Sequence, residues 1–176
     1  MKKIILNLAF LFATIIPIQA KELKFILHDK CINNLYMPAS AYFMYDKIDI
    51  IRDSRGIILR FKLVNPMDEY YTLSSDTIQK LQKISAFLAK IKNPVIIEVH
   101  NEKLLQNNLK FLKNWEISTV IASNIEKVML NLNKSIEGRI NSVGYGEFMP
   151  TKNTSNNGGK ILSRVDIIIL CNISGE

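Results

Sequence analysis

The chain has 176 residues, a formal net charge of +7 and 48% hydrophobic residues, a composition typical of one folded domain. The basic residues are scattered along the sequence, so the charge does not indicate nucleic-acid binding. A modest positive charge suits an anionic surface, and it equally suits ordinary solubility. His28 has no second histidine near it, and we expect a surface or loop position rather than a metal site.

The N-terminus has the pattern of a secretory signal peptide. Two lysines precede an apolar run from Ile4 to Ile18, and the small residue Ala20 follows. The run is shorter than the roughly 20 residues of a membrane span, although an uncleaved anchor is the alternative. We expect cleavage after Ala20, which leaves an exported chain with a net charge of +5 and no transmembrane helix.

Export bears on the two cysteines, Cys31 and Cys171. An oxidising compartment favours a disulfide between them. The apolar strand pattern around Cys171 is also typical of a buried free thiol. The sequence leaves both arrangements open.

The first predicted element after the signal peptide (residues 1–20) is an N-terminal extension, residues 21–49, with at most one short strand in residues 21–30. A single domain follows over residues 50–176. In it, apolar and basic residues alternate over residues 57–63, which predicts a half-buried strand. Ser74 to Asp76 are caps for a helix, whose predicted buried face is Ile78, Leu81, Ile84, Leu88 and Ile91.

The next predicted strand, Val95–His100, is apolar and β-branched, so we expect it to be buried on both faces. Asn114 begins a second helix, with a buried face made by Ile117, Val120 or Ile121, Ile125, Val128 and Leu132. Strands over residues 139–143 and 165–171 flank a polar loop. The order β-α-β-α-β-β predicts an α+β fold, a two-layer sandwich with two helices packed on a mixed sheet.

No catalytic pattern is present in the sequence. No serine lies in a nucleophile elbow and no carboxylates pair at helical spacing. The pair Gly144 and Gly146 precedes a loop rather than a helix, so it is not a dinucleotide-binding motif. We therefore expect a protein that is not an enzyme and that uses no cofactor and no metal.

Four segments resemble, in the same order, the motifs of the OmpA C-terminal family of peptidoglycan-binding domains, especially its flagellar stator (MotB-like) branch. They are Val99–Glu102, Asn114–Ala122, Gly144–Pro150 and Leu162–Asp166. The segment Arg52–Leu59 also looks like the first strand of that family. The resemblance covers roughly residues 50–172 and implies the family's fold.

The resemblance also implies a ligand site. In the family, a loop aspartate and a helix arginine hold the charged ends of diaminopimelate in the peptide stem. Glu102 and Ile121 occupy those positions here, and Leu162–Ser163 replace an Asn-Arg pair, which leaves Arg164. The candidate ligand-binding residues are Asn101, Glu102, Asn114, Ser118 and Arg164.

The function implied is that of a non-enzymatic cell-envelope protein in the periplasm, in association with the outer membrane or cell wall. It would bind peptidoglycan non-covalently and weakly, because Ile121 cannot pair with a carboxylate. The alternative is a degenerate scaffold that binds other envelope proteins through an apolar patch containing Ile121 and Leu162.

Overall fold

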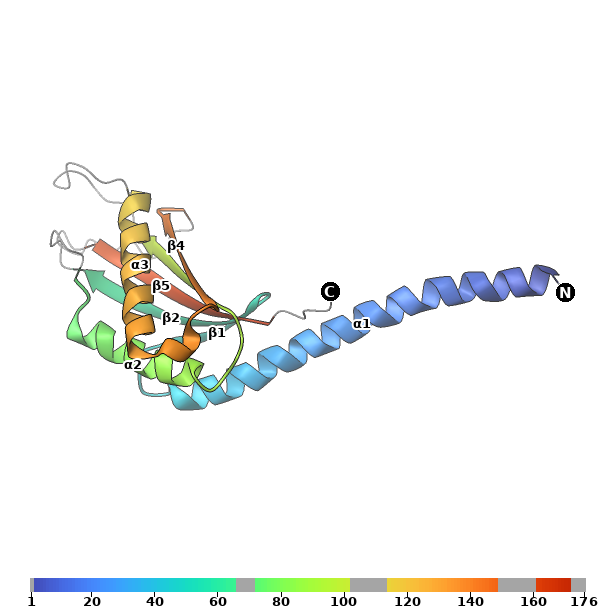
Figure 1. Ribbon diagram of the computed structural model, residues 1–176, viewed down its shortest axis with the longest axis horizontal. Coiled ribbons are helices and arrows are strands. Elements are labelled where there is room, and N and C mark those ends of the chain that lie inside the picture. The colour runs from blue at the N-terminus through green and yellow to red at the C-terminus, as the bar shows by residue number, and fades with distance from the viewer. Residues whose placement is uncertain (1, 66–71, 102–113, 149–160, 172–176) are drawn as a thin grey trace.

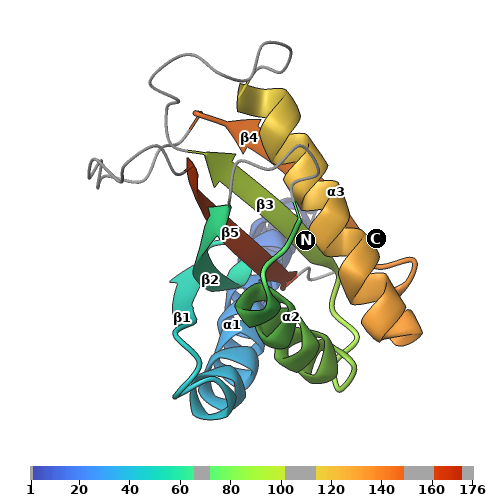
Figure 2. The same cartoon turned by 90° about the vertical axis from the view of Figure 1, so that its left-hand side faces the viewer.

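Five strands form one mixed sheet in the order β1-β2-β5-β3-β4 (Figure 2). The computed structural model describes residues 2–65, 72–101, 114–148 and 161–171. The strands are β1 (Asp49–Asp53), β2 (Gly56–Asn65), β3 (Val95–Asn101), β4 (Ile140–Gly146) and β5 (Ile161–Leu170). Strands β3 and β4 are parallel, and the other neighbours are antiparallel. The predicted α+β sandwich with a mixed sheet is confirmed.

Two helices, α2 (Ser75–Leu88) and α3 (Asn114–Leu132), cover one face of this sheet (Figure 2). Ser74 caps α2 as predicted, because its Oγ accepts a hydrogen bond from the Thr77 amide at 3.2 Å. A short 3-10 helix, η1 (Lys134–Ile136), follows α3. Leu81, Ile84 and Leu88 of the predicted buried face are fully buried. Ile78 is half-buried, and Ile91 is half-buried beyond the end of the helix.

The buried face of α3 settles the choice left open by the sequence. Ile121 is fully buried, whereas Val120 is 37% exposed. Leu132, predicted to be buried, is 40% exposed, and Met129 is the buried residue at that end. Met129 lies four residues after the buried Ile125 on the same face, whereas Leu132 is the last residue of the helix.

The region before β1 differs from the prediction of an extension with at most a short strand. It forms a single helix, α1 (Lys2–Tyr42), whose N-terminal part extends away from the sheet (Figure 1). Cys31, Leu35, Ala39 and Phe43 recur every four residues along α1 and its C-terminal end, and they pack against the core. A pattern limited to the last third of so long a helix is easily missed. In the described part of the chain, no helix is long and apolar enough to cross a membrane. Cleavage after Ala20 stays a prediction.

A disulfide joins Cys31 of α1 to Cys171, the residue that follows β5. The two Cα atoms are 5.9 Å apart, and the bond spans 140 residues of sequence. His28 lies one helical turn before Cys31, and its ring nitrogens lie 3.0 and 2.9 Å from the carbonyl oxygens of Cys171 and Ser54. The disulfide is therefore the arrangement adopted, and His28 is held by the backbone around it rather than lying free on the surface.

Strand β1 was not predicted as a separate element. It pairs with β2 in an antiparallel hairpin, with Asp53 opposite Gly56. Gly56 has φ of +149°, and a Cβ there would lie 2.0 Å from the carbonyl oxygen of Ile169. Only glycine fits this turn, because any side chain would collide with the backbone of β5.

Candidate functional site

The start of α3 lies directly against the end of β4. A Cβ on Gly144 would lie 2.2 Å from the Thr119 amide nitrogen, and one on Gly146 would lie 2.9 Å from the Trp115 amide nitrogen. Ser118 joins the two elements, because its Oγ donates to the Trp115 carbonyl at 2.9 Å and accepts from the Gly146 amide at 2.8 Å. The glycine motif at the end of β4 therefore permits close backbone packing against α3.

The end of β3 lies beside the start of β5 at the same end of the sheet. Asn101 is opposite Ser163, and the Ser163 hydroxyl donates to Asn101 Oδ1 at 2.9 Å. Both side chains are buried, and alternation along the strands places them on the sheet face that carries α2 and α3. This pair links β3 to β5 where the connection to α3 begins.

Three of the five predicted ligand residues can be placed from their side chains. Asn101 and Ser118 are both buried on the helix side of the sheet, in the hydrogen bonds described above. Arg164 follows Ser163 and therefore points to the opposite face, so the structure does not bring it together with Asn101. Asn114 begins α3 as predicted, and its side chain is outside the described part of the chain. Glu102 lies outside the described residues.

Ile121, at the family's arginine position, is part of the hydrophobic core and has no exposed surface. It therefore contributes nothing to the apolar surface patch of the alternative hypothesis, and the side chain of Leu162 is outside the described part of the chain. The exposed aromatic residues near this end of the sheet are instead Trp115, at 51%, and Phe148, at 71%.

Replacement of Gly144 by alanine tests the close contact between β4 and α3. The new methyl group would force the helix away from the strand, and we expect the free energy of unfolding to fall by about 2–3 kcal/mol. Urea unfolding measures the difference. The matched control is Asn141→Ala, an exposed position of the same strand, where a change within about 0.5 kcal/mol is expected. Equal stability of the two variants would contradict the contact.

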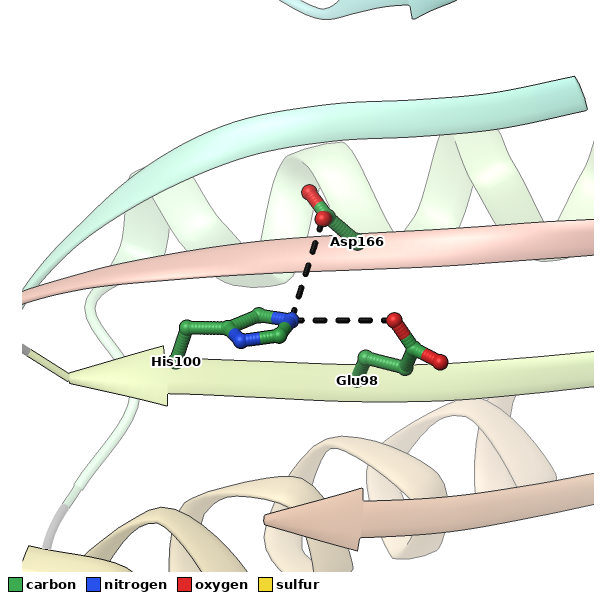
Figure 3. A group of neighbouring side chains, drawn as sticks. All are labelled: Glu98, His100 and Asp166. Atoms are coloured by element: carbon green, nitrogen blue, oxygen red, sulfur yellow. Dashed lines mark ion pairs between the residues drawn. The ribbon is translucent and has the colours of Figure 1, made fainter. Parts of the chain in front are cut away.

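A second group of polar residues lies on the face of the sheet opposite α2 and α3, here called the second face (Figure 3). Glu98 and His100 come from β3 and Asp166 from β5, and their exposures are 5%, 1% and 2%. His100 Nε2 lies 3.6 Å from Glu98 Oε2 and 3.8 Å from Asp166 Oδ2. We call these three residues the second-face cluster.

Arginines surround the cluster and bind its carboxylates. Arg60 holds Asp166 with two bonds of 2.7 and 2.8 Å, and Arg164 Nε donates to Asp166 Oδ2 at 3.1 Å. Arg55 donates to Glu98 Oε1 at 2.7 Å. These charge-assisted bonds explain how two carboxylates remain buried side by side.

The Arg55–Glu98 contact also shifts the pKa values of both groups. Burial raises the pKa of the Glu98 carboxyl, but the neighbouring His100 and Arg55 outweigh burial and leave that pKa below its ordinary value. Bonds to Glu98 and then to Asp53 raise the pKa of the Arg55 guanidinium above its usual range. Both members of the Arg55–Glu98 pair are therefore charged at neutral pH.

The His100 ring is held on two sides. It stacks on Tyr145 of β4 with ring centroids 4.9 Å apart and an interplanar angle of 3°. Its Nδ1 lies 3.3 Å from the Phe148 carbonyl oxygen, which is an acceptor only, so Nδ1 carries a proton and donates. Its Nε2 is buried and has no hydrogen-bond partner within the described residues.

The sequence predicted a buried strand that ends at His100, but it did not predict this cluster. The available signal was the alternation of Glu98 and His100 within an otherwise apolar strand, which places both side chains on one face. Asp166 is distant in sequence, and only the pairing of β3 with β5 brings it alongside. No residue pattern within a single element identifies such a pairing.

Comparison with known proteins identifies the fold. No family model matches the chain. A curated relative, the uncharacterized protein YtxE of Bacillus subtilis, is 28% identical over 122 residues, which cover 67% of this chain and 50% of YtxE. The chain thus matches about half the length of that relative.

Two solved structures superpose on most of this chain. A MotB-like protein from Desulfovibrio vulgaris superposes with a TM-score of 0.66 at 19% identity, over 82% of this chain and 98% of its own. The chain has the OmpA-like fold of the MotB domains. The cell wall anchor of the type VI secretion system from Pseudomonas aeruginosa shares this OmpA-like fold, with a TM-score of 0.59 at 13% identity over 74% of this chain and 96% of the anchor. Neither name is that of an enzyme, in agreement with the prediction from the sequence.

Proposed function

We propose that this protein associates non-covalently with peptidoglycan in the bacterial cell envelope. The observation that carries the proposal is the OmpA-like fold, shared with a protein that is named as a cell wall anchor. The proposed binding edge is where β3 ends, α3 begins and β4 ends. Asn101, Asn114 and Gly146 lie in these three elements, in the order in which the family's motifs occur.

The proposed affinity is low. Ile121 is buried and apolar, so no guanidinium at that position holds the carboxylate of the peptide stem. Loss of a bidentate charged partner costs about 2–5 kcal/mol, a factor of roughly 30 to several thousand in affinity. Glu102 keeps a carboxylate at the family's aspartate position for pairing with the ammonium group of the stem.

The proposed location is the periplasm, after export directed by residues 1–20, with the outer membrane or cell wall nearby. The disulfide between Cys31 and Cys171 supports export, because structural disulfides persist in oxidising compartments and are rare in the cytosol.

Cosedimentation with purified sacculi tests the proposal. We expect the protein to pellet with sacculi at low ionic strength and to be released as salt is added, because the proposed contacts are charged. The variant Glu102→Gln should pellet less, whereas Asn141→Ala, on the exposed second face of β4, should pellet like the wild type. If the wild type stays in the supernatant at low salt, the proposal is wrong.

A further inference from the structure

His100 Nε2 is buried beside two carboxylates of the second-face cluster. Nδ1 donates to the Phe148 carbonyl, which leaves Nε2 as the ring nitrogen that can bind a metal. Nε2 faces Glu98 Oε2 and Asp166 Oδ2, at 3.6 and 3.8 Å, which are acceptors. Asp166 Oδ2 also accepts from Arg60 and Arg164, whereas His100 Nε2 has no hydrogen-bond partner among the described residues.

The spacing of these three atoms suits a metal ion. All three lie within 4.8 Å of one another. Zinc binds histidine nitrogen and carboxylate oxygen at about 2.0–2.2 Å in tetrahedral geometry, which separates its ligands by roughly 3.4 Å. The two distances from His100 Nε2, 3.6 and 3.8 Å, lie within a few tenths of an ångström of this value. We infer that the second-face cluster is a binding site for a divalent zinc ion, with Glu98, His100 and Asp166 as ligands.

The surroundings of His100 match those of a metal-binding histidine. Metal-bound histidines commonly donate their second ring N–H to a backbone carbonyl or carboxylate, which fixes the tautomer and the ring orientation. The Phe148 carbonyl does this here, and the Tyr145 ring stacked on the imidazole keeps it in plane. The imidazole ligand favours zinc over magnesium and calcium, which prefer oxygen ligands alone.

The arginines determine which oxygens are available to the metal. Arg55 binds Oε1 of Glu98, so Oε2 is the atom that faces His100. Asp166 Oδ2 accepts from both Arg60 and Arg164, so a metal at this oxygen competes with them. Arg164 makes the longer bond to this oxygen and is the arginine that the metal would displace. The site would then link β3 to β5 across the second face, independently of any binding of peptidoglycan.

Titration calorimetry of the chelator-treated protein with zinc chloride tests the inference. We expect one zinc ion per chain and a rise in Tm with zinc concentration. His100→Gln and Glu98→Gln should each weaken binding more than about tenfold. Arg164→Gln should strengthen it, because a competitor for Asp166 is removed.

The matched control is His28→Ala, which removes the other histidine of the chain. The His28 ring nitrogens lie 3.0 and 2.9 Å from two backbone carbonyl oxygens beside the disulfide, and loss of this ring should leave zinc affinity unchanged. Circular dichroism establishes that each variant is folded, and Glu98→Gln alone decides the test if His100→Gln does not fold. Absence of zinc-dependent heat and of any change in Tm would overturn the inference. Unaltered affinity in Glu98→Gln would also overturn it, since the metal would then lie elsewhere.

Discussion

Replacing Ile121 with arginine is expected to lower the free energy of unfolding by about 4 kcal/mol or more. Ile121 is fully buried in the core between α3 and the sheet, so the guanidinium would be taken out of water and placed among apolar side chains. The same substitution introduces the residue that the family carries at this position. We nevertheless expect no gain in sacculus binding, because the side chain at this position points into the core. Urea unfolding gives the stability change, and cosedimentation gives the binding.

The matched control is Val120→Arg, which places the same charge one residue away on the same helix. Val120 is 37% exposed, so its replacement should change stability by less than about 1 kcal/mol. If Ile121→Arg were as stable as Val120→Arg and bound sacculi more tightly, position 121 would open onto a ligand pocket. The buried position of Ile121 would then be wrong.

Removal of the disulfide is expected to have an effect of similar size. The bond closes a loop of 140 residues and so restricts the unfolded chain. Its loss raises the conformational entropy of the unfolded chain and favours unfolding. We expect the free energy of unfolding of the double variant Cys31→Ala, Cys171→Ala to be about 3–5 kcal/mol lower than that of the oxidised wild type. Denaturant unfolding without reducing agent measures this difference.

The reduced wild type provides the control, because it should match the double variant and thus exclude an effect of the alanines themselves. The end of α1 should remain partly packed in both, since Leu35, Ala39 and Phe43 still reach the core. A difference below about 1 kcal/mol would mean that α1 is held by these apolar contacts and that the disulfide adds little.

The sequence predicted the elements whose pattern is local. Each of these patterns belongs to a single element. The alternation in β2 and the helical spacing of α2 each mark one buried face, and the apolar run of β3 marks two. The OmpA-like order of motifs then predicted how the elements combine. Helix α1 was missed because only its last turns contact the core, so its apolar residues cover one short stretch.

The candidate site was less predictable, for a geometric reason. Successive residues of a strand point to opposite faces, so Ser163 joins Asn101 on the helix side while Arg164 joins His100 on the other. A motif written as consecutive letters does not separate these faces. The second-face cluster depends in addition on the register between β3 and β5, which no local pattern contains.

The proposed binding edge can be tested with a probe that the chain already carries. Trp115 is the single tryptophan of the sequence, and it lies half-exposed in the first turn of α3, against the end of β4. Its fluorescence should therefore respond to a ligand bound at this edge. The most direct measurement is a fluorescence titration with a soluble muropeptide that contains diaminopimelate. The account predicts a saturable change in emission that is reduced in Glu102→Gln. No change up to about 1 mM muropeptide, a free energy of binding weaker than about −4 kcal/mol, would contradict it.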